Sequence, residues 1–122
     1  MEYLLEGNEL LIFCNQSSHE QNICSIMNDH NTPKAYGVMS DRVLFLMHIF
    51  VPDEMRRRGM GSRLLRYFLR EGYNHGCRRA ELDDMSHMFN QPTNLYVKHG
   101  FHYTKKGHPE MCMALGRNNV RD

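Results

Sequence analysis

The sequence predicts an α/β fold of the α+β kind, with many strands, one long helix and one short helix. An apolar run at residues 43–51, rich in β-branched and aromatic side chains, predicts a strand that is buried on both faces. Residues 61–76 carry apolar side chains at helical spacing, which predicts the long helix. Residues 77–82 predict the next strand. Because a strand, helix, strand unit in one sheet is nearly always right-handed and parallel, the two strands should be parallel.

Short strands are expected before this unit. Two of them should flank a Gly7-Asn8 turn, as in a hairpin. A third is predicted over Ile23 to Met27, and a fourth over residues 35–39 with a break at Gly37. No stretch before residue 55 has clear helical periodicity, so N-terminal helices should be reduced or absent.

After the second parallel strand, the sequence predicts a short helix and a closing hairpin. Pro92 is a suitable first helical residue, and Gly100 should end that helix. Residues 101–104 and 110–115 should form the hairpin, while residues 116–122 should fray as a tail. At 122 residues, the whole chain is expected to be one domain, residues 1–122.

A charged glycine turn separates the apolar run from the long helix. Residues 56–62 are Arg-Arg-Arg-Gly-Met-Gly-Ser. Gly59 and Gly61 lack a β-carbon, so backbone N–H groups there can approach an anion at a helix N-terminus. A dinucleotide fingerprint needs a third glycine where Leu64 stands, and the Gly-Lys-Ser/Thr of a P-loop is absent. The turn therefore predicts a phosphate site of another kind.

Two stretches carry a family resemblance. The pattern Arg/Gln-x-x-Gly-x-Gly/Ala, filled by Arg56, Gly59 and Gly61, resembles the acyl-CoA pyrophosphate loop of the GCN5-related N-acetyltransferases, the GNAT superfamily. Residues 95–101, Leu-Tyr-Val-Lys-His-Gly-Phe, resemble the family's Leu-Tyr-x-x-x-Gly-Phe near the C-terminus. The resemblance implies a mostly antiparallel sheet whose central parallel strands splay apart, with acetyl-CoA between them.

The resemblance also implies which residues bind acetyl-CoA. The backbone at the end of the first parallel strand would pair with the pantetheine arm of the cofactor, and the turn would hold the pyrophosphate. The implied cofactor-binding residues are Ile49, Phe50, Val51, Arg56, Arg57, Arg58, Gly59, Met60, Gly61, Ser62 and Asn90. Asn90 lies one place later than the family's asparagine.

Transfer of an acetyl group to an amine needs a proton donor for the leaving thiolate and a neutral amine. Tyr96 occupies the place of the family's tyrosine and is the predicted acid, because a phenol with a pKa of about 10 stays protonated at neutral pH. The base is open. His48 is the titratable group of the apolar run, and Asp83 and Asp84 follow the second parallel strand, at the strand ends where open α/β sheets bind ligands. We take Asp84 and His48 as candidates, with deprotonation through water as a third possibility.

Each candidate also has an ordinary structural interpretation. Three consecutive arginines are typical of a solvated face or a nucleic-acid contact. A lone histidine in an apolar run is often a core residue, and Asp84 could cap a helix or lie in a solvated loop. Tyr96 could be a half-buried helical residue.

Composition narrows the function classes. A formal charge of +1 and a pI of about 7.8 argue against nucleic-acid binding as a general role. No apolar run approaches the length of a membrane span, so a cytoplasmic protein without a membrane partner is expected. Eight histidines show no metal-ligand spacing, which predicts no metal site.

The resulting prediction is an acetyl-CoA-dependent N-acetyltransferase that acts on an amine of unknown identity. The alternative is a non-catalytic CoA-binding or protein-interaction module on the same scaffold. It is motivated by the missing N-terminal helices, which in the resembling family help to wall the acceptor site. A homodimer could complete such a wall.

Overall fold

The computed structural model describes residues 1–14, 21–85 and 94–120. The elements run in the order β1 (Glu2–Glu6), β2 (Glu9–Phe13), α1 (Ile23–Met27), β3 (Lys34–Ser40), β4 (Val43–Phe50), the 3-10 turn η1 (Asp53–Met55), α2 (Met60–Asn74), β5 (Arg79–Asp83), α3 (Leu95–Lys98), β6 (His102–Tyr103) and β7 (Glu110–Ala114). None of the helices in these ranges is long and apolar enough to cross a membrane.

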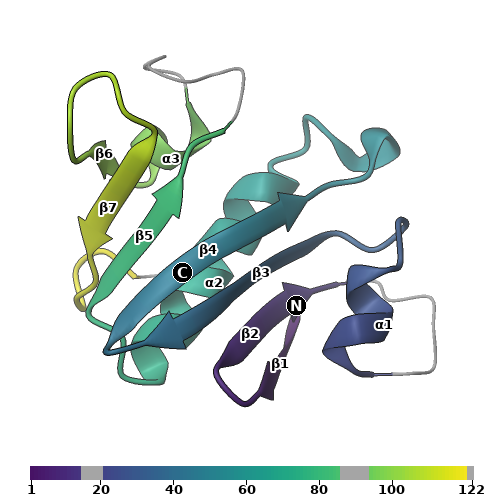
Figure 1. Cartoon of the computed structure of the whole chain (residues 1–122). Helices are drawn as coiled ribbons and strands as arrows, with labels where there is room; N and C mark the ends of the chain where they lie inside the picture. Colours follow the sequence, from purple (N-terminus) through teal and green to yellow (C-terminus); the bar gives the residue numbers. More distant parts are fainter. Residues whose placement is uncertain (15–20, 86–93, 121–122) are drawn as a thin grey trace.

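The strands of the described residues form one mixed sheet of seven strands in the order β1-β2-β3-β4-β5-β7-β6. Neighbouring strands are antiparallel except β4 and β5, which are parallel. In Figure 1, β4 and β5 start close together and diverge toward their C-terminal ends, with α2 behind the sheet. The predicted mostly antiparallel sheet with a central splayed parallel pair is confirmed.

Helix α2 covers the centre of one face of the sheet. Its buried stripe consists of Leu64, Leu65, Phe68 and Leu69, which pack with alternate residues of the strands. The helix ends at Asn74, and Gly76 follows with a positive φ of 99°, as expected for the glycine that terminates a helix. The long helix predicted from the apolar spacing is therefore confirmed.

Gly37 of β3 packs closely against Phe68 of α2 and the backbone of β4. A β-carbon at this position would come within 2.0 Å of the Phe45 carbonyl oxygen and 2.6 Å of Phe68 Cζ. The register between β3 and β4 shifts at the same place, because Tyr36 is opposite His48 whereas Gly37 is opposite Leu46. The prediction that the strand breaks at Gly37 is wrong, because β3 runs without interruption from Lys34 to Ser40. The irregularity lies in β4, where Met47 has no partner in the register, as in a β-bulge.

The prediction of a strand over Ile23 to Met27 is wrong, because these residues form α1. Asn22 caps the helix, since its side chain accepts a hydrogen bond from the Ser25 N–H at 2.8 Å. Ile23 and Ile26 are three residues apart, so they share one face and pack on the second face of the sheet. With only five residues, α1 agrees with the expectation that N-terminal helices are reduced.

The expectation that residues 43–51 are buried on both faces is also wrong. Leu44 and Leu46 are buried under α2, whereas the side chain of Met47 is 64% exposed and Phe45 is only half-buried. The cluster around α1 covers the second face of the neighbouring strands, not the middle of β4. An apolar run alone does not show whether other elements pack on both faces of the strand.

Several boundaries differ from the predicted ones. Strand β5 begins at Arg79 and not at residue 77, because the Cys77 N–H is used to close α2 through a hydrogen bond to the Gly72 carbonyl at 2.9 Å. Helix α3 begins at Leu95, while Pro92 lies outside the described residues. In the tail, residues 117–119 form a turn, and Asn119 accepts a hydrogen bond from the Gly116 N–H at 2.6 Å.

Candidate functional site

The glycine turn lies at the N-terminus of α2. Gly59 is the N-cap residue, and its φ of 75° is a left-handed conformation. Glycine adopts this conformation without steric cost. It has no side chain to cap the helix, so the first backbone N–H groups of α2 are available to another acceptor. Gly61 follows one residue inside the helix. A cavity of about 420 Å³ opens here, and Ile49, Val51 and Arg57 are among its lining residues.

The three arginines of the turn are exposed but are not equivalent. Arg56 donates from Nε to the Val51 carbonyl at 3.2 Å and pairs with Asp53 at 2.9 Å, so its side chain braces the turn. Arg57 has a positive φ of 65°. Such a conformation is uncommon for a residue with a β-carbon. The turn is therefore a specific, partly strained conformation with a high density of positive charge.

The parallel pairing of β4 and β5 is short. Three residue pairs are in register, and the last joins Phe45 to Glu81. Strand β4 continues to Phe50 and β5 to Asp83, so the described residues leave the β5-facing edge of β4 unpaired beyond Phe45. An unpaired edge presents N–H and C=O groups that can pair with an extended ligand.

A second cavity, of about 380 Å³, lies in this opening. It is lined by residues 46–49 of β4, by Leu82 and Asp83 of β5, by Met85, and by Tyr96 of α3. Ile49 also lines the cavity of the turn, so the two spaces adjoin. The structure thus brings three predicted site residues, His48, Ile49 and Tyr96, to one cavity.

Tyr96 is half-buried at the start of α3, where its ring packs edge-on against Phe101 with centroids 6.1 Å apart. Burial raises the pKa of the Tyr96 phenol, and the negative charge of Asp84 raises it further. The phenol is therefore protonated at neutral pH and can donate a proton or a hydrogen bond.

His48 lies on β4, across the cavity from α3, and its ring stacks on Phe50 at a centroid distance of 6.3 Å. Partial burial lowers the pKa of His48, and the nearby positive charge of Lys34 lowers it further. The ring is therefore neutral at pH 7 and has a nitrogen that can accept a proton. The ring of Phe50 itself lies beside Lys34, whose Nζ is 5.4 Å from the ring centroid.

Asp84 follows β5 but is not among the residues that line these two cavities, and Asp83 lines the one between the strands instead. Asp84 is only 2% exposed, and its Oδ2 accepts hydrogen bonds from Asn94 Nδ2 at 2.7 Å and from the Tyr103 hydroxyl at 2.8 Å. Sequence reasoning missed Asn94 and Tyr103. An asparagine just before a helix is a common N-cap, and that signal could have identified Asn94.

The remaining predicted cofactor-binding residues are placed as follows. Met60 lines the turn cavity together with Gly59 and Gly61. Ser62 Oγ lies 3.1 Å from His99 Nε2, a contact that joins the start of α2 to the end of α3. Arg58 is exposed next to Gly59, and Asn90 lies outside the described residues.

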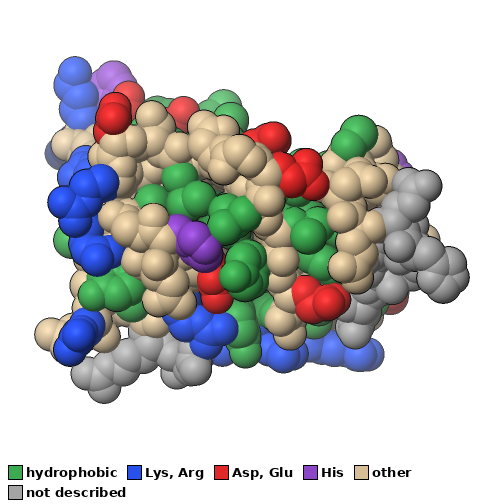
Figure 2. Space-filling view, turned by 90° about the horizontal axis from the view of Figure 1, so that it is seen from below, with side chains coloured by type: hydrophobic (Ala, Val, Ile, Leu, Met, Phe, Trp, Pro, Cys, Tyr) green, Lys and Arg blue, Asp and Glu red, His purple; other side chains and the backbone are tan. Residues whose placement is uncertain are grey.

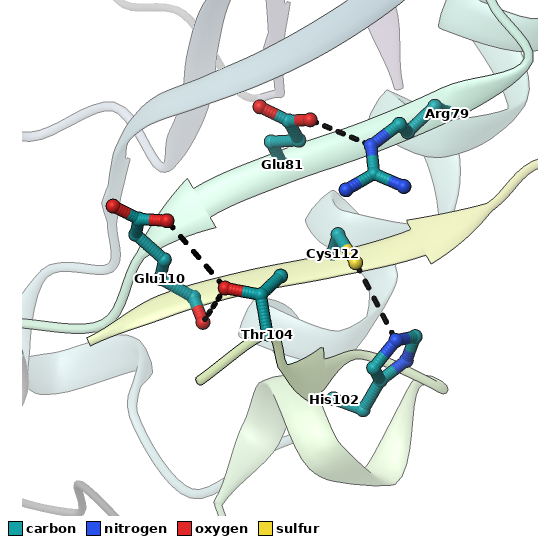
Figure 3. Close-up of polar contacts among 6 residues, drawn as sticks. All are labelled: Arg79, Glu81, His102, Thr104, Glu110 and Cys112. Carbon is teal, nitrogen blue, oxygen red and sulfur yellow. Dashed lines mark hydrogen bonds and ion pairs between the residues drawn. The ribbon is translucent and has the colours of Figure 1, made fainter. Parts of the chain in front are cut away.

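The second face of the sheet is open and polar over β5, β7 and β6. Figure 3 shows six of its side chains: Arg79, Glu81, His102, Thr104, Glu110 and Cys112. Glu81 accepts from Arg79 Nε at 2.6 Å, and Cys112 Sγ lies 3.4 Å from His102 Nε2. A cavity of about 410 Å³ on this face shares Leu82 and Asp83 with the cavity between the strands.

The opposite end of the molecule carries the β1–β2 and β3–β4 turns. Viewed from that end, hydrophobic side chains lie beside a histidine, acidic side chains are interspersed among them, and Lys and Arg side chains lie along the left and lower edges (Figure 2). Tyr3 and Leu5 are exposed on β1, and the rings of Tyr3 and His75 are 5.7 Å apart. A cavity of about 480 Å³ lies there. The whole length of β4 separates it from the glycine turn, so it is not part of the candidate site.

Within the described ranges, no group of three or more His, Cys, Asp or Glu side chains is arranged to hold a metal ion.

Solved structures resemble this fold. An acetyltransferase from Bacillus cereus ATCC 14579 has 23% identity and a TM-score of 0.65, over 88% of this chain and 73% of the other. The ribosomal-protein-S18-alanine N-acetyltransferase from Escherichia coli has 18% identity and a TM-score of 0.63, over 93% and 76%. At these identities the similarity shows that the fold is shared.

A model of the acetyltransferase (GNAT) domain family matches residues 9–103 of the 122-residue chain. The chain therefore belongs to the GNAT acetyltransferase domain family, and the family resemblance of the two sequence stretches is confirmed. No curated protein matches the chain.

The chain is shorter than its structural relatives. It covers 60% of a GNAT-family acetyltransferase from Staphylococcus aureus Mu50, with 16% identity and a TM-score of 0.57 over 69% of this chain. The fold and the family are thus shared, while the substrate is a separate question.

Proposed function

We propose that the protein is an acetyl-CoA-dependent N-acetyltransferase that moves an acetyl group from the thioester to an amine. The observation that carries the proposal is the path formed by the two adjoining cavities. One end of the path is the glycine turn with its arginines, and the other end lies between His48 and Tyr96. A long ligand with an anionic end and a reactive acyl end matches this path.

The residues of the turn fit the anionic part of acetyl-CoA. The N-terminal N–H groups of α2 offer hydrogen bonds and a partial positive charge. Gly59 has no neighbouring atom within 4 Å of where a β-carbon would stand. Arg57 and Arg58 add charge at the surface. The site therefore has donors, charge and open space for a pyrophosphate.

The edge of β4 fits the pantetheine arm. Beyond Phe45 this edge of β4 has no partner strand among the described residues, so the backbone groups that point toward the opening can pair with a ligand. An amide-bearing chain can pair with them as an added strand. Ile49 and Val51 supply apolar surface between the strand edge and the glycine turn. The same edge offers an N–H to the acyl carbonyl oxygen, on which negative charge develops during transfer.

Tyr96 and His48 supply the proton transfers. Acetyl-CoA provides the activated thioester, the neutral imidazole of His48 accepts a proton from the attacking amine, and the phenol of Tyr96 donates one to the departing sulfur. Their pKa values are displaced in the directions that keep both groups in the required protonation state at neutral pH. The amine enters from the open second face, where Asp83 borders the cavity.

The proposal is tested by measuring release of free CoA from acetyl-CoA in the presence of a panel of small amines, polyamines and lysine- or N-terminal-amine peptides. We expect at least one acceptor to accelerate CoA release well above the hydrolysis rate, with loss of the effect in Tyr96→Phe. Binding of acetyl-CoA without transfer to any acceptor would instead favour a non-catalytic CoA-binding module.

A further inference from the structure

Asp84 joins four segments of the chain just beyond the end of β5. Its backbone N–H donates to the Pro109 carbonyl at 2.8 Å, before β7. Its Oδ2 accepts from Asn94 Nδ2 at 2.7 Å and from the Tyr103 hydroxyl of β6 at 2.8 Å. A buried carboxylate that accepts from two donors in this way is held in one orientation.

Asn94 transmits this orientation to α3. It is 1% exposed, and its Oδ1 accepts from the backbone N–H of Tyr96 at 2.7 Å and of Val97 at 3.4 Å. Asn94 is the N-cap of a helix of only four residues. So short a helix has little stability of its own. The position of Tyr96 therefore depends on the cap, and the cap depends on Asp84.

We propose that Asp84 is a positioning residue for acetyl transfer, which acts through the Asn94 side chain to hold the backbone of Tyr96 at the opening between β4 and β5. This assignment rests on the proposed function and replaces a role for Asp84 as the base. The carboxylate faces Asn94 and Tyr103, and it is Asp83 that borders the cavities.

Both ends of α3 contact the cofactor turn. His99 Nε2 lies 3.1 Å from Ser62 Oγ in the first turn of α2, and Leu95 Cδ2 comes within 3.5 Å of an ideal β-carbon on Gly61. Helix α3 is thus held by α2 on one side and by Asp84 on the other. Loss of the Asp84 contact leaves these contacts with α2 in place and releases the Asn94 cap that holds the backbone N–H of Tyr96.

The test compares two substitutions of Asp84. Asp84→Ala removes the acceptor, and kcat should fall by about 10- to 100-fold because a displacement of about 1 Å at a reacting group costs about that much. Asp84→Asn keeps one carbonyl oxygen where Oδ2 accepts both donors, so most of the rate should return. A base role predicts that both variants are equally slow, since neither side chain can accept a proton, and that result would overturn the proposal.

A double-mutant cycle tests whether Asp84 acts through Tyr96. In the Tyr96→Phe background, Asp84→Ala should lower kcat by less than about 3-fold, because coupled groups are strongly non-additive. The Michaelis constant for acetyl-CoA should stay nearly unchanged in Asp84→Ala. Full additivity of the two losses would show that Asp84 affects the rate by another route.

If Asp84→Ala does not fold, Tyr103→Phe removes the hydroxyl that donates to Asp84 and leaves the carboxylate and Asn94 in place. Its matched control is Thr32→Val, which removes a hydroxyl–carboxylate hydrogen bond of 2.7 Å to Asp29 at the α1–β3 turn. Amide hydrogen exchange of Tyr96 and Val97 should accelerate in Tyr103→Phe and not in Thr32→Val, and equal exchange in both would contradict the positioning role. This readout needs no turnover, so it separates a failure of the positioning proposal from a failure of the proposed activity.

Discussion

The two halves of the candidate site are built from different parts of the chain. The glycine turn is made of backbone: Gly59 in its left-handed conformation, the N–H groups at the start of α2, and the edge of β4. The transfer end is made of side chains, with Tyr96 and His48 facing one cavity and Asp84 behind α3. Backbone sites depend on conformation, whereas side-chain sites depend on how distant segments are held together.

This difference sets which substitutions should matter at each half. At the transfer end, removal of one atom from a side chain is expected to lower the rate without changing cofactor affinity. At the turn, a change of backbone conformation or of charge is expected to lower affinity without changing the chemistry. The following predictions separate the two halves, from the largest effect to the smallest.

Tyr96→Phe should lower kcat by roughly 100- to 10,000-fold, the usual contribution of general acid catalysis. The affinity for acetyl-CoA should change little because the ring stays. Steady-state kinetics and calorimetric titration measure the two quantities, with Tyr3→Phe on exposed β1 as the matched control. A Tyr96→Phe enzyme with full activity would remove the acid role.

Replacement of Arg57 and Arg58 by glutamine should weaken acetyl-CoA binding more than binding of acetyl-pantetheine, which lacks the pyrophosphate; Arg56 is left in place because its side chain braces the turn. Charge-assisted hydrogen bonds contribute about 1.5 to 3 kcal/mol each, so a loss of about 10-fold or more in the affinity for acetyl-CoA is expected. Lys105 and Lys106, exposed in the β6–β7 hairpin, provide a control with the same charge change. Equal losses for both ligands would place the pyrophosphate elsewhere.

Gly59→Ala should lower the free energy of unfolding by about 1 kcal/mol, because a left-handed conformation is unfavourable for a residue with a β-carbon. Gly107→Ala in the β6–β7 hairpin is a close control: its φ is also positive, and neither glycine has an atom within 4 Å of the added β-carbon. Both variants should lose similar stability in denaturant titrations, but only Gly59→Ala should bind acetyl-CoA more weakly. A loss of affinity in both would indicate a general effect of stability.

The smallest effect concerns pH. Burial and Lys34 lower the pKa of His48. The neutral base therefore persists below the usual value of about 6.5 and is lost only as the pH falls through the lowered pKa. The acid limb of the kcat/KM profile should lie below a pH of about 6.5 and disappear in His48→Gln. An acid limb that persists in His48→Gln would assign the base to another group.

The basic limb of the same profile reports Tyr96. Burial and the charge of Asp84 raise the pKa of this phenol. The acid form is therefore lost only above the ordinary value of about 10, which is where the basic limb should lie. A basic limb near neutral pH that survives in Tyr96→Phe would belong to a different group.

Much of the backbone half could be predicted from the sequence. The strand, glycine turn and helix are contiguous, and the spacing of Gly59 and Gly61 indicates the local conformation directly. The parallel direction of β4 and β5 follows from the strand, helix, strand order, whereas their splaying apart is implied only by the family resemblance. Local sequence indicates local structure, so the part of the site that is contiguous in the chain could be predicted from the sequence.

The side-chain half could be predicted only in part. Tyr96 and His48 stand out by type and place, but the relation of Asp84 to Asn94 and Tyr103 depends on contacts between segments 10 and 19 residues apart. The helical identity of residues 23–27 was missed because a five-residue helix has too few turns to show periodicity. Such features follow from tertiary packing, which composition and spacing do not reveal.

The central claim, that the turn and the unpaired edge of β4 hold acetyl-CoA, is tested most directly by backbone amide NMR during a titration with acetyl-CoA. We predict that the largest shift changes occur at Gly59 to Ser62 and at Ile49 to Val51, with little change at Gly7 or Asp41 at the opposite end of the sheet. Shift changes centred on that opposite end, or none up to millimolar acetyl-CoA, would contradict the account.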